Sequence, residues 1–286
     1  MSISNVHNNC SLSIDSFQKL REMFNERFGI LFNDGDRYLL ESRLSARILD
    51  LSLDGFEEYA DLLSNTSQSG ELESAIEMLT NNETYFFRED YQLNAFSAEI
   101  LPSLQRRNVR KRHLNIWSAG CSSGEEVYSI AIFIAESELF TNWNVRVFGS
   151  DISSRMLARA RSGIFSKSAF RNTSDYLRMK YFRRVGTEWA LKNSIKEKCN
   201  FAKINLLDAA RAGMLGKFDA IFCRNVLMYF DRQSRTDTIE LFHRHLNASG
   251  YLLLGHTESL FNQKTPFAPV ELHNAMVYQK REEAFV

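Results

Sequence analysis

The sequence predicts an α/β protein: a doubly wound domain with a small antiparallel β-ribbon, preceded by a small all-helical domain. Three observations lead to this prediction. Residues 114–127 read as an apolar strand, a turn of small residues and the start of a helix, which is the nucleotide-cradling unit of doubly wound folds. From residue 114 onward, strand and helix patterns alternate. Between residues 14 and 80, only helical patterns occur.

The first domain is expected to be a helical bundle. Apolar spacing predicts helices at 16–28, 37–49, 56–63 and 72–79, with Ser16 as the first cap and Gly29 as the first stop. In the second of these helices, Arg43 and Arg47 lie four residues apart on one face. A basic stripe of this kind is most often a solvated helix face.

A bridge at residues 81–113 joins the two domains. Its first part, residues 81–88, combines polar residues suited to helix caps with three consecutive aromatic residues and Arg88, which is unusual for a linker. Its last part, residues 105–112, is a basic run directly before the first strand.

The second domain is expected to contain both parallel strands and a small ribbon. The strands are predicted at 114–117, 145–149, 201–204, 218–223 and 250–255, with a short edge strand at 277–279. Helices are predicted from Glu125, around 156–160, at 175–182 and at 234–246. Charged and apolar residues alternate over 183–201 around Gly186, which indicates a short antiparallel ribbon.

The composition limits the possible functions. In 286 residues, 35 lysines and arginines balance 35 aspartates and glutamates, so a dominant attraction to nucleic acid is not expected. Cys10, Cys121, Cys199 and Cys223 form no Cys-x-x-Cys pair, which argues against a zinc site or a disulfide framework. No apolar run approaches a membrane span, and residues 1–13 lack the apolar core of a signal peptide. We therefore expect a cytoplasmic protein that holds no metal and does not insert into a membrane.

Polar residues follow the expected strands, where doubly wound folds bind their ligands. They are residues 120–125, Asp151, Asn205 and residues 224–225. A carboxylate in the position of Asp151 is the usual partner of ribose hydroxyls, although Asp151 could instead cap the next helix. Because acidic rather than basic residues follow the glycine turn, a phosphate is disfavoured and a ligand with cationic groups is favoured. S-adenosylmethionine, with its sulfonium and amino groups, is such a ligand.

Four segments resemble, in the same order, the motifs of a known family. They are residues 82–89 (NETYFFRE), 117–131 (WSAGCSSGEEVYSIA), 222–231 (FCRNVLMYFD) and 250–259 (GYLLLGHTES). On these motifs, the chain is similar to the chemotaxis receptor glutamate O-methyltransferases of the CheR type, from about residue 15 to about residue 281. The first and third motifs are specific to that family, whereas the second is shared more widely among S-adenosylmethionine enzymes.

The resemblance implies an organisation and a set of site residues. It implies a receptor-docking helical domain at 1–80, a linker at 81–113 that contributes to the cofactor site, and a Rossmann-like methyltransferase domain at 114–286 with a β-subdomain at about 183–201. The implied cofactor contacts are Asn82, Thr84, Arg88, Gly120, Glu125, Asp151, Asn205, Leu206, Arg224 and Asn225. Tyr229 matches a tyrosine that lines the active site of that family, and the resemblance implies that Arg43 and Arg47 face a receptor. Arg88 and Tyr229 are the candidates for holding the acceptor group.

The implied reaction is methyl transfer from S-adenosylmethionine to glutamate side chains of chemoreceptors, which yields methyl esters and S-adenosylhomocysteine. A glutamate with a pKa of about 4.3 is already ionised at neutral pH, so no general base is needed. The enzyme must align the reacting atoms and remove water from the carboxylate. Arg88 can grip a carboxylate through two parallel N–H bonds. For Arg88 the alternatives are an ion pair with Glu89 or Asp90, or a contact with the cofactor only. For Tyr229 the alternative is a core position with a satisfied hydroxyl.

The expected partner is the cytoplasmic helical bundle of a chemoreceptor. The short loop at Gly186 favours an enzyme that does not depend on a receptor's C-terminal peptide, and a monomer is the default expectation. Two other functions stay possible: a silent sensor that binds the cofactor without methyl transfer, and a methyltransferase for a small molecule or nucleic acid. The sensor is disfavoured by the presence of Arg88, Asp151 and Tyr229. A nucleic-acid enzyme is disfavoured by the neutral charge and by the lack of proline at residues 224–227.

Overall fold

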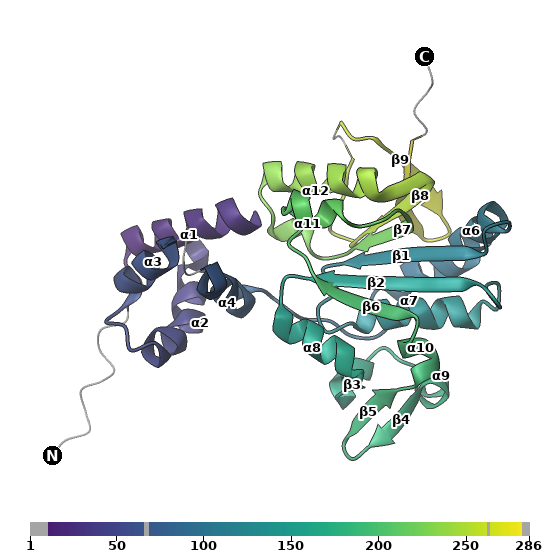
Figure 1. Ribbon diagram of the computed structural model, residues 1–286, viewed down its shortest axis with the longest axis horizontal. Helices are drawn as coiled ribbons and strands as arrows, with labels where there is room; N and C mark the ends of the chain where they lie inside the picture. The colour runs from purple at the N-terminus through teal and green to yellow at the C-terminus, as the bar shows by residue number, and fades with distance from the viewer. Residues whose placement is uncertain (1–10, 66–68, 262–263, 282–286) are drawn as a thin grey trace. The chain divides into compact units, whose positions relative to one another are not determined.

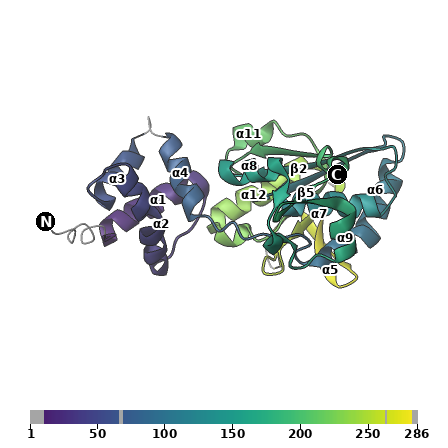
Figure 2. The same cartoon turned by 90° about the horizontal axis from the view of Figure 1, so that it is seen from below.

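The computed structural model describes residues 11–65, 69–261 and 264–281, and the chain forms two units (Figure 1, Figure 2). The first unit takes in the residues up to 81 together with Tyr229–Arg235. The second takes in Asn82–Met228 and the residues from 236 onward. Cys10 and the other residues of 1–10, part of the segment expected to lack a signal peptide, lie outside the described residues.

The first unit is helical, as expected. Its helices are α1 (Ile14–Phe28), the 3-10 turn η1 (Asp34–Asp36), α2 (Arg37–Asp50), α3 (Phe56–Ser64) and α4 (Ser69–Leu79). The left-handed Gly29, with φ at +70°, ends α1 as expected. The expected cap at Ser16 is wrong, because the helix begins one turn earlier and the Ser13 side chain accepts a hydrogen bond from the Ser16 N–H. Leu20, Phe24 and Leu44 are among the fully buried core residues.

The second unit alternates strands and helices after a helical opening. The opening consists of α5 (Asp90–Ala95), a π-helical turn η3 (Phe96–Ile100) and α6 (Leu101–Asn108). There follow β1 (His113–Ala119), α7 (Glu125–Glu136), β2 (Asn144–Asp151), α8 (Ser154–Ser162), β3 (Ile164–Phe165), η4 (Lys167–Phe170), α9 (Asp175–Tyr181), β4 (Phe182–Val185), β5 (Glu188–Leu191) and α10 (Asn193–Lys196). The chain continues with β6 (Cys199–Lys203), α11 (Ala209–Gly213), β7 (Phe218–Cys223), η5 (Leu227–Tyr229), α12 (Arg232–His245), β8 (Leu246–Leu254), β9 (Phe267–Leu272) and β10 (Ala275–Lys280).

The main sheet has a reversal of strand order that defines where a ligand can bind. Its seven strands follow the order β6-β2-β1-β7-β8-β10-β9, and the strands from β6 to β8 are parallel. The chain runs outward from β1 through β2 to β6 and then returns to β7 on the other side of β1. The crevice at the carboxyl ends of β1 and β7 is therefore the expected ligand site of a doubly wound sheet. The expected edge position of 277–279 is wrong, because β10 pairs with both β8 and β9.

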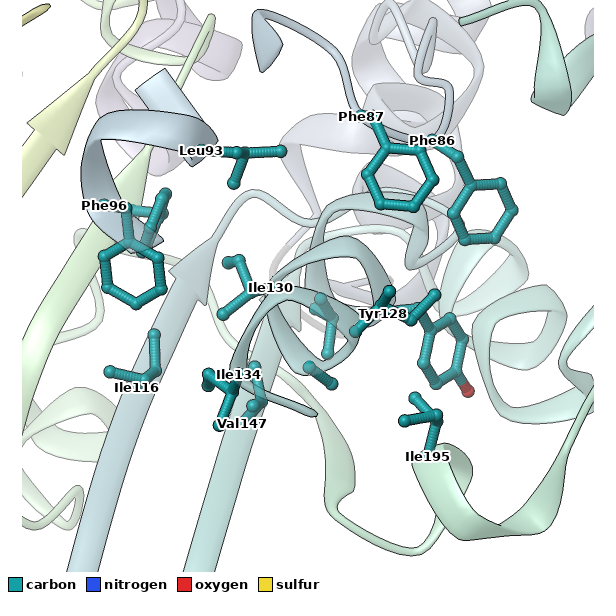
Figure 3. Close-up of a cluster of buried hydrophobic side chains, with 14 of the residues drawn as sticks. Phe86, Phe87, Leu93, Phe96, Ile116, Tyr128, Ile130, Ile134, Val147 and Ile195 are labelled. Carbon is teal, nitrogen blue, oxygen red and sulfur yellow. The ribbon is translucent and has the colours of Figure 1, made fainter. Parts of the chain in front are cut away.

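Both faces of this sheet are covered. On one face, Ile116 and Val147 belong to the same buried cluster as Ile130 of α7 and Phe96 of the helical opening (Figure 3). On the other face, the Trp117 ring lies 5.4 Å from that of Phe242 in α12. Within the described ranges, no helix is both long and apolar enough to cross a membrane.

The small sheet and the aromatic residues of the bridge form one cluster. The Phe86 ring lies 4.7, 5.0 and 4.9 Å from the rings of Phe165, Phe170 and Phe182. Each of these contacts adds about 0.5–1.5 kcal/mol beyond the area it buries. Phe86 thus anchors the bridge to the small sheet. Figure 3 shows Phe86 and Phe87 together in the buried cluster.

The expected limits of the β-subdomain, 183–201, need correction. The small sheet has the order β3-β5-β4, so it includes residues 164–165 and ends at Leu191. Residues 199–203 form β6, which pairs with β2 in the main sheet. Alternation of apolar and polar residues identifies a strand but does not identify its partner. The prediction for 183–201 therefore combined strands that belong to two different sheets.

Candidate functional site

The turn between β1 and α7 brings the backbone into a tight curve at the crevice. Gly120, Ser122 and Gly124 all have positive φ values, of +77°, +48° and +92°. The N–H groups of Gly120 and Cys121 donate to the carbonyl oxygen of Ser150 in β2, which fixes the start of the turn. A β-carbon on Gly120 would lie 2.4 Å from Cγ2 of Val226, in the segment after β7. Glycine is therefore required here by both conformation and space.

Asp151 ties the end of β2 to this turn. Its Oδ2 accepts a hydrogen bond of 2.7 Å from the Ser122 N–H, and its Oδ1 accepts one of 2.9 Å from the Ser153 N–H. The N-cap of α8 is Ser153, whose side chain accepts from the Met156 N–H. Asp151 is thus not the cap of α8, which was the alternative to a cofactor role, although it supports the cap residue.

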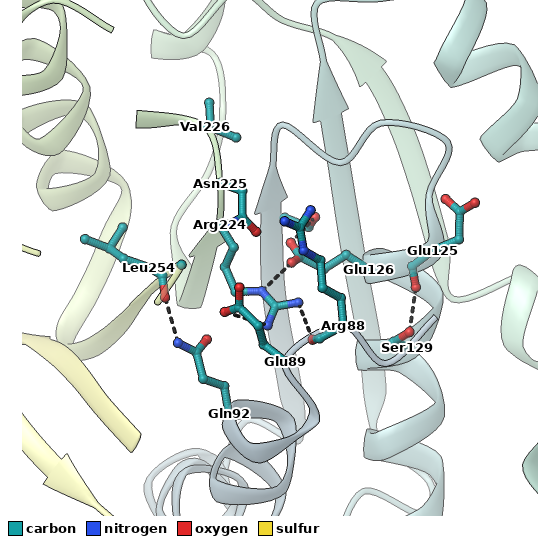
Figure 4. Close-up of polar contacts among 12 residues, drawn as sticks. Arg88, Glu89, Gln92, Glu125, Glu126, Ser129, Arg224, Asn225, Val226 and Leu254 are labelled. Atoms are coloured by element: carbon teal, nitrogen blue, oxygen red, sulfur yellow. Dashed lines mark hydrogen bonds and ion pairs between the residues drawn. The ribbon is translucent and has the colours of Figure 1, made fainter. Parts of the chain in front are cut away.

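A buried carboxylate stands at the start of α7. Glu125 is only 5% exposed, and both its oxygens accept from the Ser123 hydroxyl, at 3.1 and 2.8 Å. Burial raises the pKa of the Glu125 carboxyl above its ordinary value. In Figure 4 this side chain points away from the neighbouring Glu126. A cationic group beside Glu125 would offset the unfavourable burial of its charge.

The bridge segment that begins at Asn82 lies against the same turn. The Ser122 hydroxyl donates to the Asn82 carbonyl oxygen at 3.0 Å, and the Phe87 N–H donates to the Ser129 hydroxyl at 3.0 Å. Phe87 and Glu89 have positive φ values of +59° and +52°, so the segment is held in a strained, specific path. Thr84 is half-buried within it.

Arg224 connects the end of β7 to this segment (Figure 4). Its side chain is 2% exposed, and its Nε donates to Glu126 at 2.6 Å while Nη2 donates to the Arg88 carbonyl oxygen at 2.8 Å. Nη1 lies 3.7 Å from Oε2 of Glu89, beyond hydrogen-bond distance. The Arg224 guanidinium lies between the carboxylates of Glu126 and Glu89 and holds the backbone of Arg88 in place.

The Arg88 side chain makes few contacts within the protein. Its Nη1 donates to the Glu83 carbonyl oxygen at 3.1 Å, and its guanidinium lies 5.9 Å from the centre of the Tyr85 ring. No described carboxylate pairs with it, so the alternative of an ion pair with Glu89 or Asp90 is not what the structure contains.

Glu258, which the sequence did not indicate as a site residue, holds the segment after β7. Asn225 has a φ of +61°, and its backbone N–H donates to Glu258 at 2.8 Å. The Asn225 Oδ1 atom is buried without a hydrogen-bond partner.

Further along the sheet, Asn205 and the buried Leu206 follow β6, and the Asn205 Oδ1 accepts from the Leu207 N–H at 3.1 Å.

Tyr229 belongs to the first unit rather than to the second. It is 37% exposed, so the alternative of a core position is wrong. Its hydroxyl accepts from the Asn81 side chain at 3.4 Å, and its carbonyl oxygen accepts from the Leu31 N–H at 2.9 Å. Ile30 and Phe230 form a short antiparallel bridge beside it.

The two arginines expected to face a receptor both have partners within the first unit. Arg43 Nη1 donates to the carbonyl oxygens of residues 78–80, at the end of α4. Arg47 grips Glu71 through two hydrogen bonds of 2.9 and 2.6 Å, and the Tyr59 hydroxyl donates to the same carboxylate. The hydrogen bond from Arg47 lowers the pKa of Glu71 below its ordinary value. A docking role for the arginines stays a prediction.

Comparison with known proteins decides the family. The family model described as the CheR methyltransferase SAM-binding domain matches residues 82–276, and the CheR all-alpha domain matches residues 15–80. The chain belongs to the CheR methyltransferase family. Among similar curated CheR relatives, the chemotaxis protein methyltransferase of Borreliella burgdorferi is 34% identical over 90% of this chain and 92% of its own length.

Two further CheR relatives show the same extent of similarity. Chemotaxis protein methyltransferase 2 of Vibrio cholerae is 36% identical over 92% of this chain and 92% of its own length. The chemotaxis protein methyltransferase of Escherichia coli is 35% identical over 90% of this chain and 88% of its own length. The protein is therefore an S-adenosylmethionine-dependent methyltransferase with the Rossmann-like fold that the sequence predicted.

The crevice of this CheR protein fits its cofactor chemically. The glycine turn takes the backbone through positive φ values at Gly120, Ser122 and Gly124, at the carboxyl end of β1 where doubly wound folds bind their ligands. The buried Glu125 offers a counter-charge to a cationic group, and the Asn225 Oδ1 offers a hydrogen-bond acceptor that no described residue uses. Glu89, Glu126 and Glu258 also shape this crevice but were missed as site residues. All three lie inside the family motifs, and a carboxylate within such a motif could have identified them as site residues.

Proposed function

We propose that this protein transfers the methyl group of S-adenosylmethionine to glutamate carboxylates of chemoreceptors. The family membership supports the class of reaction, and the similarity to chemotaxis protein methyltransferases supports the signalling context. The choice of a carboxylate as the methyl acceptor rests on the contacts that Arg88 makes and on those that it leaves open. Its segment lies on the glycine turn, its backbone is held by Arg224, and its remaining guanidinium N–H groups bond to no other described residue. A planar cation so presented is suited to a carboxylate.

We further propose that the reaction needs no general base. A glutamate side chain with a pKa of about 4.3 is ionised at neutral pH. S-adenosylmethionine supplies a methyl group made electrophilic by its sulfonium. A carboxylate oxygen forms the new C–O bond as the C–S bond breaks, and the bonding electrons remain on sulfur. The protein contributes alignment of the carboxylate through Arg88 and exclusion of water.

The proposed cofactor contacts lie at the carboxyl ends of the strands and on the bridge. They are Asn82, Thr84, Arg88, Gly120, Glu125, Asp151, Asn205, Leu206, Arg224 and Asn225. The Arg224 side chain is buried between Glu126 and Glu89 and bonds to the Arg88 carbonyl oxygen. We therefore propose that Arg224 acts mainly by holding Arg88 in place. Tyr229 is proposed separately as a second acceptor contact, because it matches a tyrosine of the family's active site.

The partner proposed for the first unit is the cytoplasmic helical bundle of a chemoreceptor. Because Arg43 and Arg47 stabilise the packing of α2 against α4 and α3, their replacement would change the fold as well as the surface charge. Docking should therefore be tested by substituting exposed cations of this unit whose side chains make no described contact, such as Arg37. We propose a monomer that does not require a receptor's C-terminal peptide.

The test is a methylation assay with labelled S-adenosylmethionine and receptor-containing membranes. We expect label on a receptor-sized band that mild alkali releases as methanol, as for a carboxyl methyl ester. Arg88→Lys should lower the rate by about 10- to 100-fold, since a lysine cannot reproduce the two parallel bonds. The matched control is Arg110→Lys, an exposed arginine without described partners. Cofactor binding without any label would favour the silent sensor instead.

A further inference from the structure

We propose that Glu258 is a positioning residue of the cofactor site. Its carboxylate holds the segment after β7, and this segment in turn sets Val226 against the glycine turn and Asn225 at the crevice. The inference rests on the proposed cofactor site. Glu258 lies 33 residues from Asn225 in the chain, after the end of β8.

The Glu258 carboxylate accepts four backbone hydrogen bonds. Its Oε2 accepts from the N–H groups of Asn225 and Gly255, at 2.8 and 2.9 Å. Its Oε1 accepts from the N–H groups of Val226 and Met228, at 2.8 and 3.2 Å. Two oxygens with about four lone-pair sites are thereby used fully. Hydrogen bonds to an ionised acceptor are roughly twice as strong as neutral ones.

The segment needs such a clamp because its conformation is unfavourable by itself. Asn225 is left-handed with a φ of +61°, which a residue with a β-carbon adopts only at a cost. No strand pairing holds it, since β7 ends at Cys223. Gly255 completes the fit: a β-carbon there would lie 2.8 Å from the Asn225 nitrogen and 2.9 Å from Oε2 of Glu258.

Two features of the crevice depend on this clamped segment. The Val226 side chain occupies the space beside Gly120, where a β-carbon would approach Cγ2 to within 2.4 Å. The Asn225 Oδ1 is buried without a partner, so its direction sets where a ligand can donate a hydrogen bond. The charge of Glu258 thus acts on the cofactor through two neighbours, without contact of its own.

Glu258→Gln tests this inference because it conserves shape and removes half of the acceptors. The amide places an NH2 group against two of the four N–H donors. We expect the affinity for S-adenosylhomocysteine to fall by about tenfold in calorimetric titration. We also expect faster amide hydrogen exchange at residues 225–228, with unchanged exchange in β1 and β2. The control is Glu271→Gln, the same change at an exposed glutamate of β9 whose side chain has no described partner.

Glu258→Asp is the second variant, since it keeps the charge but shortens the side chain. It should bind with an affinity between those of the wild type and Glu258→Gln, which a loss of fold would not produce. In methylation, Glu258→Gln should raise the KM for the cofactor while kcat at saturation stays within about threefold. The inference is overturned if affinity is unchanged, or if exchange rises equally throughout the second unit. Because the binding measurement needs no acceptor, it stands even if glutamate methylation is not found.

Discussion

Gly120→Ala is the most direct test of how tightly the glycine turn is packed. The new β-carbon would lie 2.4 Å from Cγ2 of Val226, whereas carbon atoms are at their best separation at about 3.5–4.0 Å. Forcing a methyl group into a filled space costs about 1–3 kcal/mol. Placing alanine at a φ of +77° adds about 1–2 kcal/mol. We therefore expect the free energy of unfolding to fall by about 2–5 kcal/mol.

The two contributions can be separated with matched variants. Gly186 has a similar φ of +60°, but no atom lies within 4 Å of the position that its β-carbon would take, so it reports the backbone contribution alone. Gly186→Ala should therefore lose only about 1–2 kcal/mol. In the double variant Gly120→Ala/Val226→Ala, the clashing methyl group is gone, and the part due to overlap should be recovered. Urea unfolding followed by tryptophan fluorescence and circular dichroism measures these three variants beside the wild type.

The same variants report on ligand binding. Because Gly120 lies in the turn at the crevice, Gly120→Ala should also weaken binding of S-adenosylhomocysteine, whereas Gly186→Ala should not. Equal losses of stability for Gly120→Ala and Gly186→Ala would refute the close approach of Val226 to Gly120. A double variant no more stable than Gly120→Ala would do the same.

Three further predictions concern the buried Glu125, the largely buried carboxylate of Glu126 and the exposed Arg43. Glu125→Gln should raise the thermal stability of the ligand-free protein at pH 7 but not below about pH 4, where both side chains are neutral, because the raised pKa of Glu125 means that its ionisation opposes folding. A melting series from pH 4 to 8 measures this, and a constant difference would contradict it. Glu126→Ala should lower the free energy of unfolding by about 3–5 kcal/mol, since it leaves the Arg224 guanidinium short of a partner; urea unfolding tests it. Arg43→Ala should destabilise the first unit by about 1–2 kcal/mol by releasing the carbonyl groups at the end of α4, visible as faster hydrogen exchange there but not in β1.

Much of the fold could be read from local signals in the sequence. The stop at Gly29, the strand before Gly120 and the helix from Glu125 all appear as expected, because glycine conformation and apolar period act within a few residues. The same signals located Asp151 and Arg224 at strand ends. Family motifs added Asn82 and Arg88, which no periodicity could identify.

Tertiary structure alone decided which distant groups meet. Residues 199–203 joined the main sheet, and β10 became an inner strand, because a strand's pattern records burial and not the identity of its neighbour. The grip of Glu258 on Asn225 spans 33 residues, and that of Arg224 on the Arg88 carbonyl spans 136. Such bonds depend on the relative position of whole elements, set by the packing of the core. The sequence therefore determined the elements and the residue types at the crevice, and the packed sheet determined how they act together.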